Sequence, residues 1–123
     1  TIPGVFELKL CKSNALPYDA LKPHQEEALL KVARGEGLFH KISDQPIFSG
    51  MKTRFQKPKP FDCFCLASIF PAYVVVMFYA PRQPKIFYLI DILDFIEMRS
   101  TDSRKSLTKE KAEEISSLQL TAK

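Results

Sequence analysis

The alternation of apolar and polar residues near the start of the chain predicts a β-strand over residues 5–10, VFELKL. Because strand side chains alternate between two faces, Glu7 and Lys9 are expected on the same face, together with Val5. The opposite face carries Phe6, Leu8 and Leu10. Two opposite charges on one side of an otherwise apolar strand suggest a role beyond packing.

A polar connection over residues 13–19 leads to a helix that we predict over residues 23–34. Pro23 suits the first helical turn, where its missing N–H is not needed. The glycines at 35 and 37 are typical of a helix end. The apolar stripe of this helix consists of Ala28, Leu29, Val32 and Ala33.

Four further strands are predicted, over residues 38–42, 61–66, 73–79 and 86–92. The segment 73–79 contains β-branched and aromatic residues without any charge, which is typical of a central strand buried on both faces. Between the first two of these strands, residues 43–60 form a loop rich in proline and basic residues.

The C-terminal quarter is less regular. Residues 91–98 fit either a strand continuation or a short helix, and Thr108 is expected to cap a final helix. That helix would place Ala112, Ile115 and Leu118 on one face. We expect a single mixed α/β domain over residues 1–123, with residues from about 100 to 123 forming a loosely attached C-terminal helix.

Composition excludes several classes of protein. The chain has 123 residues, 46% of them hydrophobic, which is enough for one core. It has neither a run of about 20 apolar residues nor a secretory signal, so no membrane span is expected. Three cysteines favour reduced thiols and a cytoplasmic location over a disulfide framework, and with two histidines they are too few for a structural zinc site.

The first residue is not methionine, so a segment could precede residue 1. The formal net charge of +4 is compatible with a polyanionic partner but does not demonstrate one.

Glu7 and Lys9 are the first candidates for catalysis. A carboxylate can bind Mg²⁺, which prefers oxygen ligands, and a neighbouring ammonium can stabilise charge that develops on a phosphate. The alternative is an ordinary ion pair on a solvated strand face.

Gln25 belongs to the inward stripe of its helix and would reach this pair if the helix packs over the strand. A half-exposed amide that only caps the helix is the alternative. His24 points about 100° away from Gln25, which favours a phosphate contact or plain surface.

Asp62 leads an apolar strand directly after the basic loop, so it is either a turn residue or a second metal ligand. The candidate DNA contacts are Lys12, His24, Lys52, Arg54, Lys57 and Lys59, although such a basic loop is often only solvated.

The order of these motifs resembles a known group. The ELK strand, the HQ helix start and the late strands AYVVVMFY and FYLIDI are similar to the PD-(D/E)XK nuclease superfamily, and within it to the Holliday junction resolvase-like proteins of bacteria, archaea and phages. The resemblance covers about residues 5–97. It implies a restriction-endonuclease-like fold, a mixed central sheet flanked by helices.

The resemblance implies that Glu7 binds the metal, Lys9 assists catalysis and Gln25 helps to position the site. The acidic residue that normally precedes E-x-K has no counterpart upstream of Glu7 here. Either it lies before residue 1, or Asp62 takes its place, which we favour.

The expected function is that of an endodeoxyribonuclease that uses Mg²⁺ or Mn²⁺ to hydrolyse branched or recombination DNA, such as a four-way junction, as a homodimer. Glu7, Lys9, Gln25 and Asp62 would be its catalytic residues, with the metal on Glu7 and Asp62. The alternatives are a catalytically inactive DNA-binding domain of the same fold and an interaction module that binds no nucleic acid.

Overall fold

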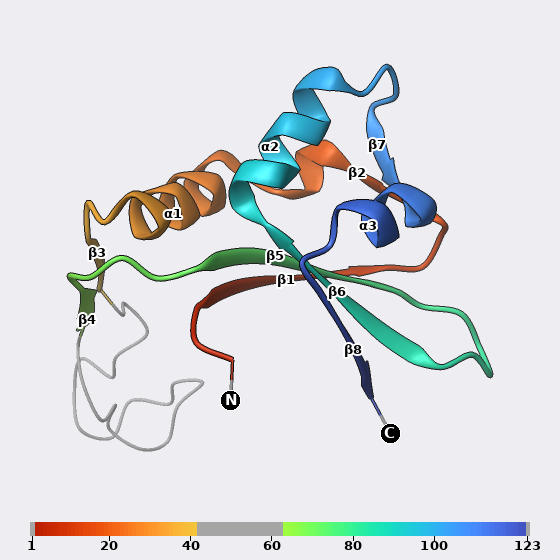
Figure 1. The fold of residues 1–123 in the computed structure, drawn as a ribbon, viewed down its shortest axis with the longest axis horizontal. Coiled ribbons are helices and arrows are strands. Elements are labelled where there is room, and N and C mark those ends of the chain that lie inside the picture. Colours follow the sequence, from red (N-terminus) through yellow and green to blue (C-terminus); the bar gives the residue numbers. More distant parts are fainter. Residues whose placement is uncertain (1, 42–62, 123) are drawn as a thin grey trace, which may run out of the picture.

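A mixed four-stranded sheet forms the centre of the molecule (Figure 1). The computed structural model describes residues 2–41 and 63–122. The strand order is β1-β5-β6-β8, with β1 parallel to β5 and the other pairs antiparallel. The strands are β1 (Val5–Cys11), β5 (Ala72–Phe78), β6 (Lys85–Asp91) and β8 (Leu118–Ala122).

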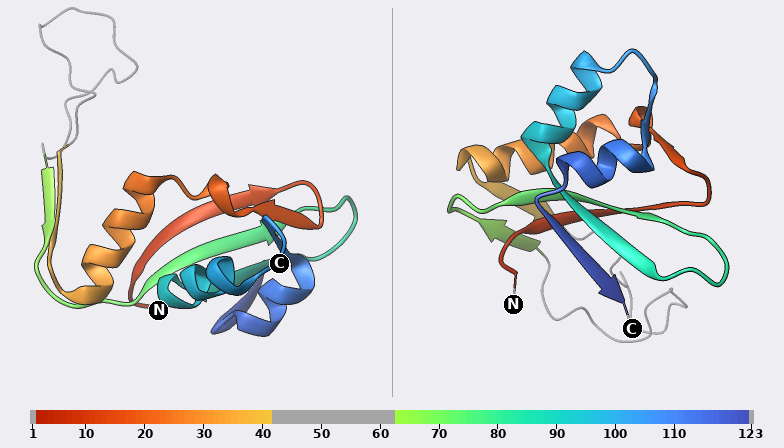
Figure 2. Two further views of the ribbon diagram at one scale, coloured as in Figure 1. Left: turned by 90° about the horizontal axis from the view of Figure 1, so that it is seen from above. Right: turned by 45° about the vertical axis from the view of Figure 1, so that its right-hand side comes forward.

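The described residues contain three α-helices, which lie over one face of this sheet (Figures 1 and 2). They are α1 (Pro23–Arg34), α2 (Ile92–Thr101) and α3 (Lys109–Ile115). The chain is therefore an α/β domain, as the sequence pattern predicts. None of the described helices is long and apolar enough to cross a membrane.

Two small antiparallel pairs complete the described fold. The first joins β2 (Ala15–Pro17) to β7 (Ser106–Thr108), and the second joins β3 (Leu38–Lys41) to β4 (Cys63–Leu66). A short 3₁₀ turn, η1 (Tyr18–Ala20), follows β2. The β3–β4 pair projects away from the main sheet beyond the end of α1 (Figure 2).

The hydrophobic core lies between the helices and the sheet. Val74 and Val76 of β5 are fully buried there, against Val32 of α1 and Phe95 of α2. Val75, on the opposite face of β5, is also buried. The prediction of a central strand is confirmed, because β5 lies between β1 and β6, whereas the predicted burial on both faces holds only in part, since Tyr73 and Met77 beside Val75 are half-buried.

Helix α1 spans residues 23–34, as predicted, and the residues expected to start and end it do so. Pro23 occupies its first turn, and Gly35 ends it in the left-handed conformation with φ of 73°. A side chain at Gly35 would be strained by this φ, and its Cβ would collide with Ile69.

The C-terminal segment departs from the expected single helix. Thr108 does cap α3 by accepting a hydrogen bond from the Lys111 N–H, but the helix ends at Ile115. The Ser117 N–H then donates a hydrogen bond to the Leu89 carbonyl of β6, and β8 begins at the next residue, Leu118. The placement of Leu118 on the last helix is therefore wrong, because Leu118 pairs with Leu89 as part of the sheet.

The connection over residues 13–19 also contains more structure than its polarity predicts. Leu16 of β2 pairs with Leu107 of β7, and both side chains are buried. Tyr18, two residues after Leu16, is also buried, and its hydroxyl donates a hydrogen bond to Asp102.

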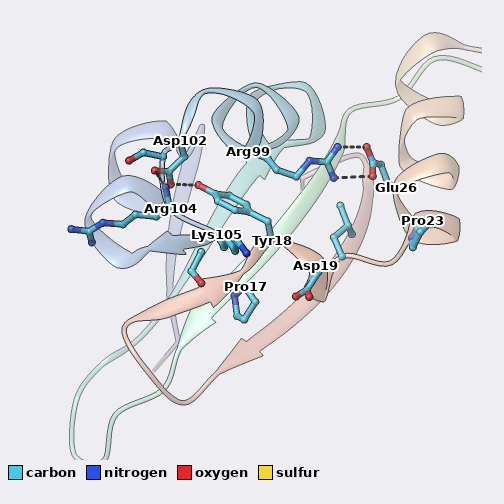
Figure 3. A pocket seen from close by; sticks show the side chains of 12 residues that line it. Pro17, Tyr18, Asp19, Pro23, Glu26, Arg99, Asp102, Arg104 and Lys105 are labelled. Carbon is cyan, nitrogen blue, oxygen red and sulfur yellow. Dashed lines mark hydrogen bonds and ion pairs between the residues drawn. The ribbon is translucent and has the colours of Figure 1, made fainter.

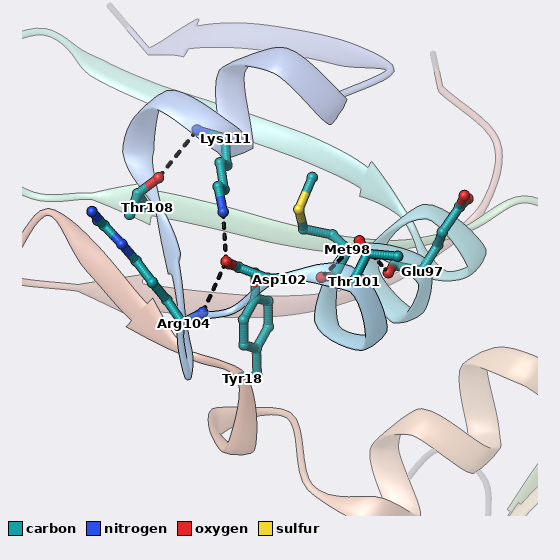
Figure 4. A network of polar contacts seen from close by, with 8 residues as sticks. All are labelled: Tyr18, Glu97, Met98, Thr101, Asp102, Arg104, Thr108 and Lys111. Atoms are coloured by element: carbon teal, nitrogen blue, oxygen red, sulfur yellow. Dashed lines mark hydrogen bonds and ion pairs between the residues drawn. The ribbon is translucent and has the colours of Figure 1, made fainter.

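Two polar networks fasten the outer elements to each other. Arg99 of α2 donates two hydrogen bonds, of 3.0 and 2.8 Å, to the carboxylate of Glu26 on α1. Asp102, after α2, accepts a hydrogen bond from Lys111 of α3 (Figure 4) and another from the Tyr18 hydroxyl. Bonds from Lys111 and then from Tyr18 hold the pKa of Asp102 below its usual value.

Tyr88 of β6 makes the stability of the domain sensitive to alkaline pH. Its side chain is buried, and its hydroxyl donates a 2.9 Å hydrogen bond to Glu113. Burial, and then this bond, raise the pKa of Tyr88 to about 12 from the ordinary value of 10.0. The neutral phenol is thus favoured in the folded state, and its contribution is complete below pH 10.

We expect the free energy of unfolding to fall between pH 10 and about 12, by about 2–3 kcal/mol from Tyr88. Denaturant unfolding across this range measures the loss. Tyr88→Phe keeps the ring and removes the titrating group, so this variant should lose less stability. Parallel curves for the two proteins would contradict the assignment.

Candidate functional site

A cavity of about 450 Å³ opens between β1, α1 and the start of β3. Its polar lining comes from one residue of β1 and from four residues of α1. Those residues are Glu7, His24, Gln25, Glu27 and Lys31. The remaining walls are largely apolar and include Val5, Ala28, Leu29 and Leu38.

The alternation of β1 sets the direction of its two charges. Glu7 is in register with Val74 and Lys9 with Val76, and these valines belong to the core under the helices. Glu7 and Lys9 therefore face the helix side of the sheet, as Val5 does. Their side chains are only 30% and 16% exposed.

The predicted convergence of Glu7, Lys9 and Gln25 is present in the structure. The Lys9 ammonium lies 3.2 Å from Glu7 Oε1 and donates a 2.9 Å hydrogen bond to Gln25 Oε1. A partly buried ammonium needs such partners, since an unpaired charge there is costly. Below, these three residues are called the ELK–Gln cluster.

Gln25 combines the two roles that the sequence left open. Its Oε1 also accepts a 3.0 Å hydrogen bond from the Lys22 backbone N–H, which forms part of a capping box at the start of α1. The same amide oxygen therefore fixes the helix end and holds Lys9. The conformation of the helix start and the position of Lys9 are coupled.

Glu27 and Lys31 line the same cavity and were not singled out from the sequence. They form an ion pair of 3.2 Å, four residues apart on α1, with side chains 67% and 45% exposed. Their spacing of three and seven residues from His24 places all three on one side of the helix. This spacing could have identified Glu27 and Lys31 from the sequence, but surface ion pairs at this spacing are common, so it does not single out a functional site.

The other candidate residues divide into two groups. His24 lines the cavity and is exposed, whereas the exposed Lys12 follows the far end of β1 and does not line it. Asp62 and the basic residues Lys52, Arg54, Lys57 and Lys59 lie outside the described residues. Asp62 as a metal ligand and the loop as a DNA contact therefore stay predictions.

A larger cavity, of about 650 Å³, lies beside η1 and α2 (Figure 3). Several of its charged groups already have partners. Arg99 is bound to Glu26, and Asp102 is bound to Tyr18 and Lys111. These contacts hold α1, α2 and η1 together, which is a structural role.

The cavity lined by Glu7 and Gln25 offers oxygen atoms of the kind that a divalent cation binds. Mg²⁺ is commonly bound by one or two carboxylates together with waters and substrate phosphates. Glu7 supplies one partly exposed carboxylate, while the Gln25 oxygen is occupied by Lys9 and by the Lys22 N–H. The described residues contain no group of three His, Cys, Asp or Glu side chains suited to a metal.

Gln25→Leu should lower the free energy of unfolding by about 1–3 kcal/mol, because Lys9 loses an acceptor and α1 loses part of its cap. Chemical denaturation measures this change. Gln83→Leu, in the exposed turn between β5 and β6, is the matched control and should change stability by less than about 0.5 kcal/mol. Equal effects of the two substitutions would show that the Lys9–Gln25 bond contributes nothing.

Comparison of the chain with models of protein families, with curated proteins and with solved structures finds no match in any of the three. The family resemblance therefore rests on the sequence motifs, and the site is defined by its own geometry.

Proposed function

We propose that this protein is a metal-dependent endodeoxyribonuclease with a restriction-endonuclease-like fold of the PD-(D/E)XK type, acting on branched or recombination DNA. The observation that carries the proposal is the ELK–Gln cluster. A carboxylate, an ammonium and an amide from two separate elements meet beside one cavity, with the Lys9 ammonium 3.2 Å from Glu7 Oε1 and 2.9 Å from Gln25 Oε1.

The topology around the cluster supports the same proposal. Strand β1 carries Glu7 and Lys9, α1 follows it and packs against the sheet, and β5 returns parallel to β1. The cavity lies between β1, α1 and the start of β3, with Glu7 in its wall. A phosphodiester can approach Glu7 from solvent there, since its side chain is partly exposed.

Each residue of the cluster has a distinct task in the proposed reaction. Glu7 is the residue that would hold Mg²⁺ or Mn²⁺, which when bound lowers the pKa of a water and polarises the phosphate. Lys9 places its positive charge beside Glu7, where it stabilises negative charge that develops on the phosphate. Gln25 keeps the Lys9 ammonium in this position.

A second carboxylate would strengthen cation binding. Asp62 is the candidate that the sequence favours, and an acidic residue preceding residue 1 is the other. Among the described strands, β1 pairs only with β5, so its other edge is open to a further strand beside Glu7.

A catalytically inactive DNA-binding domain is the second candidate function. One observation favours it: Lys9 is already neutralised by Glu7, so the pair is also a sufficient structural ion pair. In that case His24, Lys12 and the basic loop would bind phosphates in a salt-dependent manner, and no strand would be cut.

Glu7→Gln separates the two functions. The substitution keeps the shape of the side chain and removes the charge that would bind the cation, so cleavage should fall at least about 100-fold. The assay compares four-way junction, duplex and single-stranded DNA with Mg²⁺ or Mn²⁺. Glu36→Gln, an exposed residue just after α1, is the control and should cut at the unaltered rate.

Cleavage that persists undiminished in Glu7→Gln would remove the nuclease proposal. Salt-sensitive DNA binding by the unaltered protein, without scission under either cation, would establish the second function in its place.

A further inference from the structure

The cavity of about 650 Å³ lies between η1, the start of α1 and residues 102–106, and we call it the η1 cleft. It shares no lining residue with the cavity beside the ELK–Gln cluster. Its volume falls within the range of about 300–1,000 Å³ that is typical of cavities for small organic molecules. The η1 cleft is therefore a separate candidate for ligand binding.

The two long walls of the η1 cleft are fixed to each other. The Tyr18 N–H donates a 3.1 Å hydrogen bond to the Lys105 carbonyl, and the Tyr18 hydroxyl donates to Asp102. Asp102 also accepts hydrogen bonds from Lys111 and from the Arg104 N–H. These bonds form without any ligand, so a ligand would enter a preformed cleft and would lose little affinity to ordering it.

One wall of the cleft carries cations and hydroxyls that are available to a ligand. The side chains of Arg104 and Lys105 are exposed, and they take part in none of the ion pairs between described residues. Ser103 and Ser106 flank them and line the same cleft. Lys105 lies beside Tyr18, whereas Arg104 extends outward at the rim (Figure 3). Two cations with two hydroxyl donors suit an anionic group such as a phosphate.

The rest of the cleft suits the body of an organic molecule. Three apolar residues form much of the wall on the side of η1 and α1, namely Pro17, Leu21 and Pro23. Asp19 lines the cleft on the other side of the Tyr18 ring from Arg104 (Figure 3). A carboxylate repels a second anionic group and accepts hydrogen bonds from hydroxyl or amino groups. The cleft thus fits a ligand with one anionic end, an apolar middle and hydrogen-bond donors.

We propose that the η1 cleft binds a nucleoside monophosphate. The phosphate lies against Lys105, with the hydroxyls of Ser103 and Ser106 as donors, and its two negative charges are balanced by Lys105 and Arg104. The base covers the apolar wall, and the ribose hydroxyls donate to Asp19. A sugar phosphate without a base would leave the apolar wall exposed to water.

The composition of the cleft favours a free nucleotide over a nucleic-acid strand. A strand requires cations along several phosphates. The η1 cleft has two available cations, and the acidic residues Asp19 and Glu26 also line it. The proposal goes beyond the nuclease function and does not depend on it, because it uses no metal ion and no residue of the ELK–Gln cluster.

Calorimetric titration of the full chain with AMP, in the absence of divalent cations, tests the proposal. We expect saturable binding of one AMP per chain. Adenosine lacks the anionic group and inorganic phosphate lacks the apolar body, so each should bind at least about tenfold more weakly. A single-stranded DNA that ends in a 5′-phosphate should also bind this site more weakly than AMP, because Asp19 and Glu26 repel its further phosphates.

Lys105→Gln should weaken AMP binding at least about tenfold, because it removes the cation beside the phosphate. The fold should be retained, since Lys105 contributes its backbone carbonyl to the contact with Tyr18. Lys85→Gln, at the exposed start of β6 and outside the cleft, is the matched control and should bind AMP normally. Glu7→Gln should also bind AMP normally, which separates this site from the proposed nuclease site. Circular dichroism verifies that the variants fold.

The absence of saturable AMP binding would overturn the proposal, as would an AMP affinity that Lys105→Gln leaves unchanged. Equal affinity for adenosine would overturn the role of the anionic group, and equal affinity for inorganic phosphate would overturn that of the apolar wall. Tighter binding of the 5′-phosphorylated DNA, lost in Lys105→Gln, would overturn the free nucleotide as the ligand. Loss of AMP binding in Glu7→Gln would overturn the assignment to the η1 cleft.

Discussion

The Lys9 ammonium, held between the Glu7 carboxylate and the Gln25 amide, is the interaction on which the candidate site depends. Lys9 is largely covered, so its charge must be compensated by nearby acceptors. One acceptor comes from β1 itself and the other from the first turn of α1. The contact therefore links the register of a strand to the start of a helix, and it brings the polar groups of both elements to one cavity.

Neighbouring contacts keep α1 in place. Arg99 of α2 binds Glu26, one residue after Gln25, through two hydrogen bonds, and these bonds lower the pKa of Glu26. This ion pair adds stability at neutral pH that is lost as the pH falls through the lowered pKa of Glu26. Gly35 ends the same helix where a larger residue would meet Ile69. The cluster is thus supported by packing and by polar contacts that have no part in the proposed reaction.

The sequence predicted elements that are specified locally and missed those that depend on distant partners. Pro23 and Gly35 define α1, and the uncharged run of β5 identifies a central strand. The short strands β2 and β7 exist only because they pair with each other, and Leu118 pairs with β6 instead of extending a helix. The convergence of Gln25 with the charges of β1 was predictable from helical periodicity. The exposure of Leu8 on the other face was not, because alternation does not tell which face the helices cover.

The proposed nuclease function requires that Glu7 present a carboxylate able to bind a divalent cation beside Lys9. Calorimetric titration of the folded protein with Mn²⁺, without DNA, tests this claim most directly. We expect Mn²⁺ to bind the unaltered protein and to bind Glu7→Gln at least about tenfold more weakly. Identical titration curves for the two proteins would contradict it.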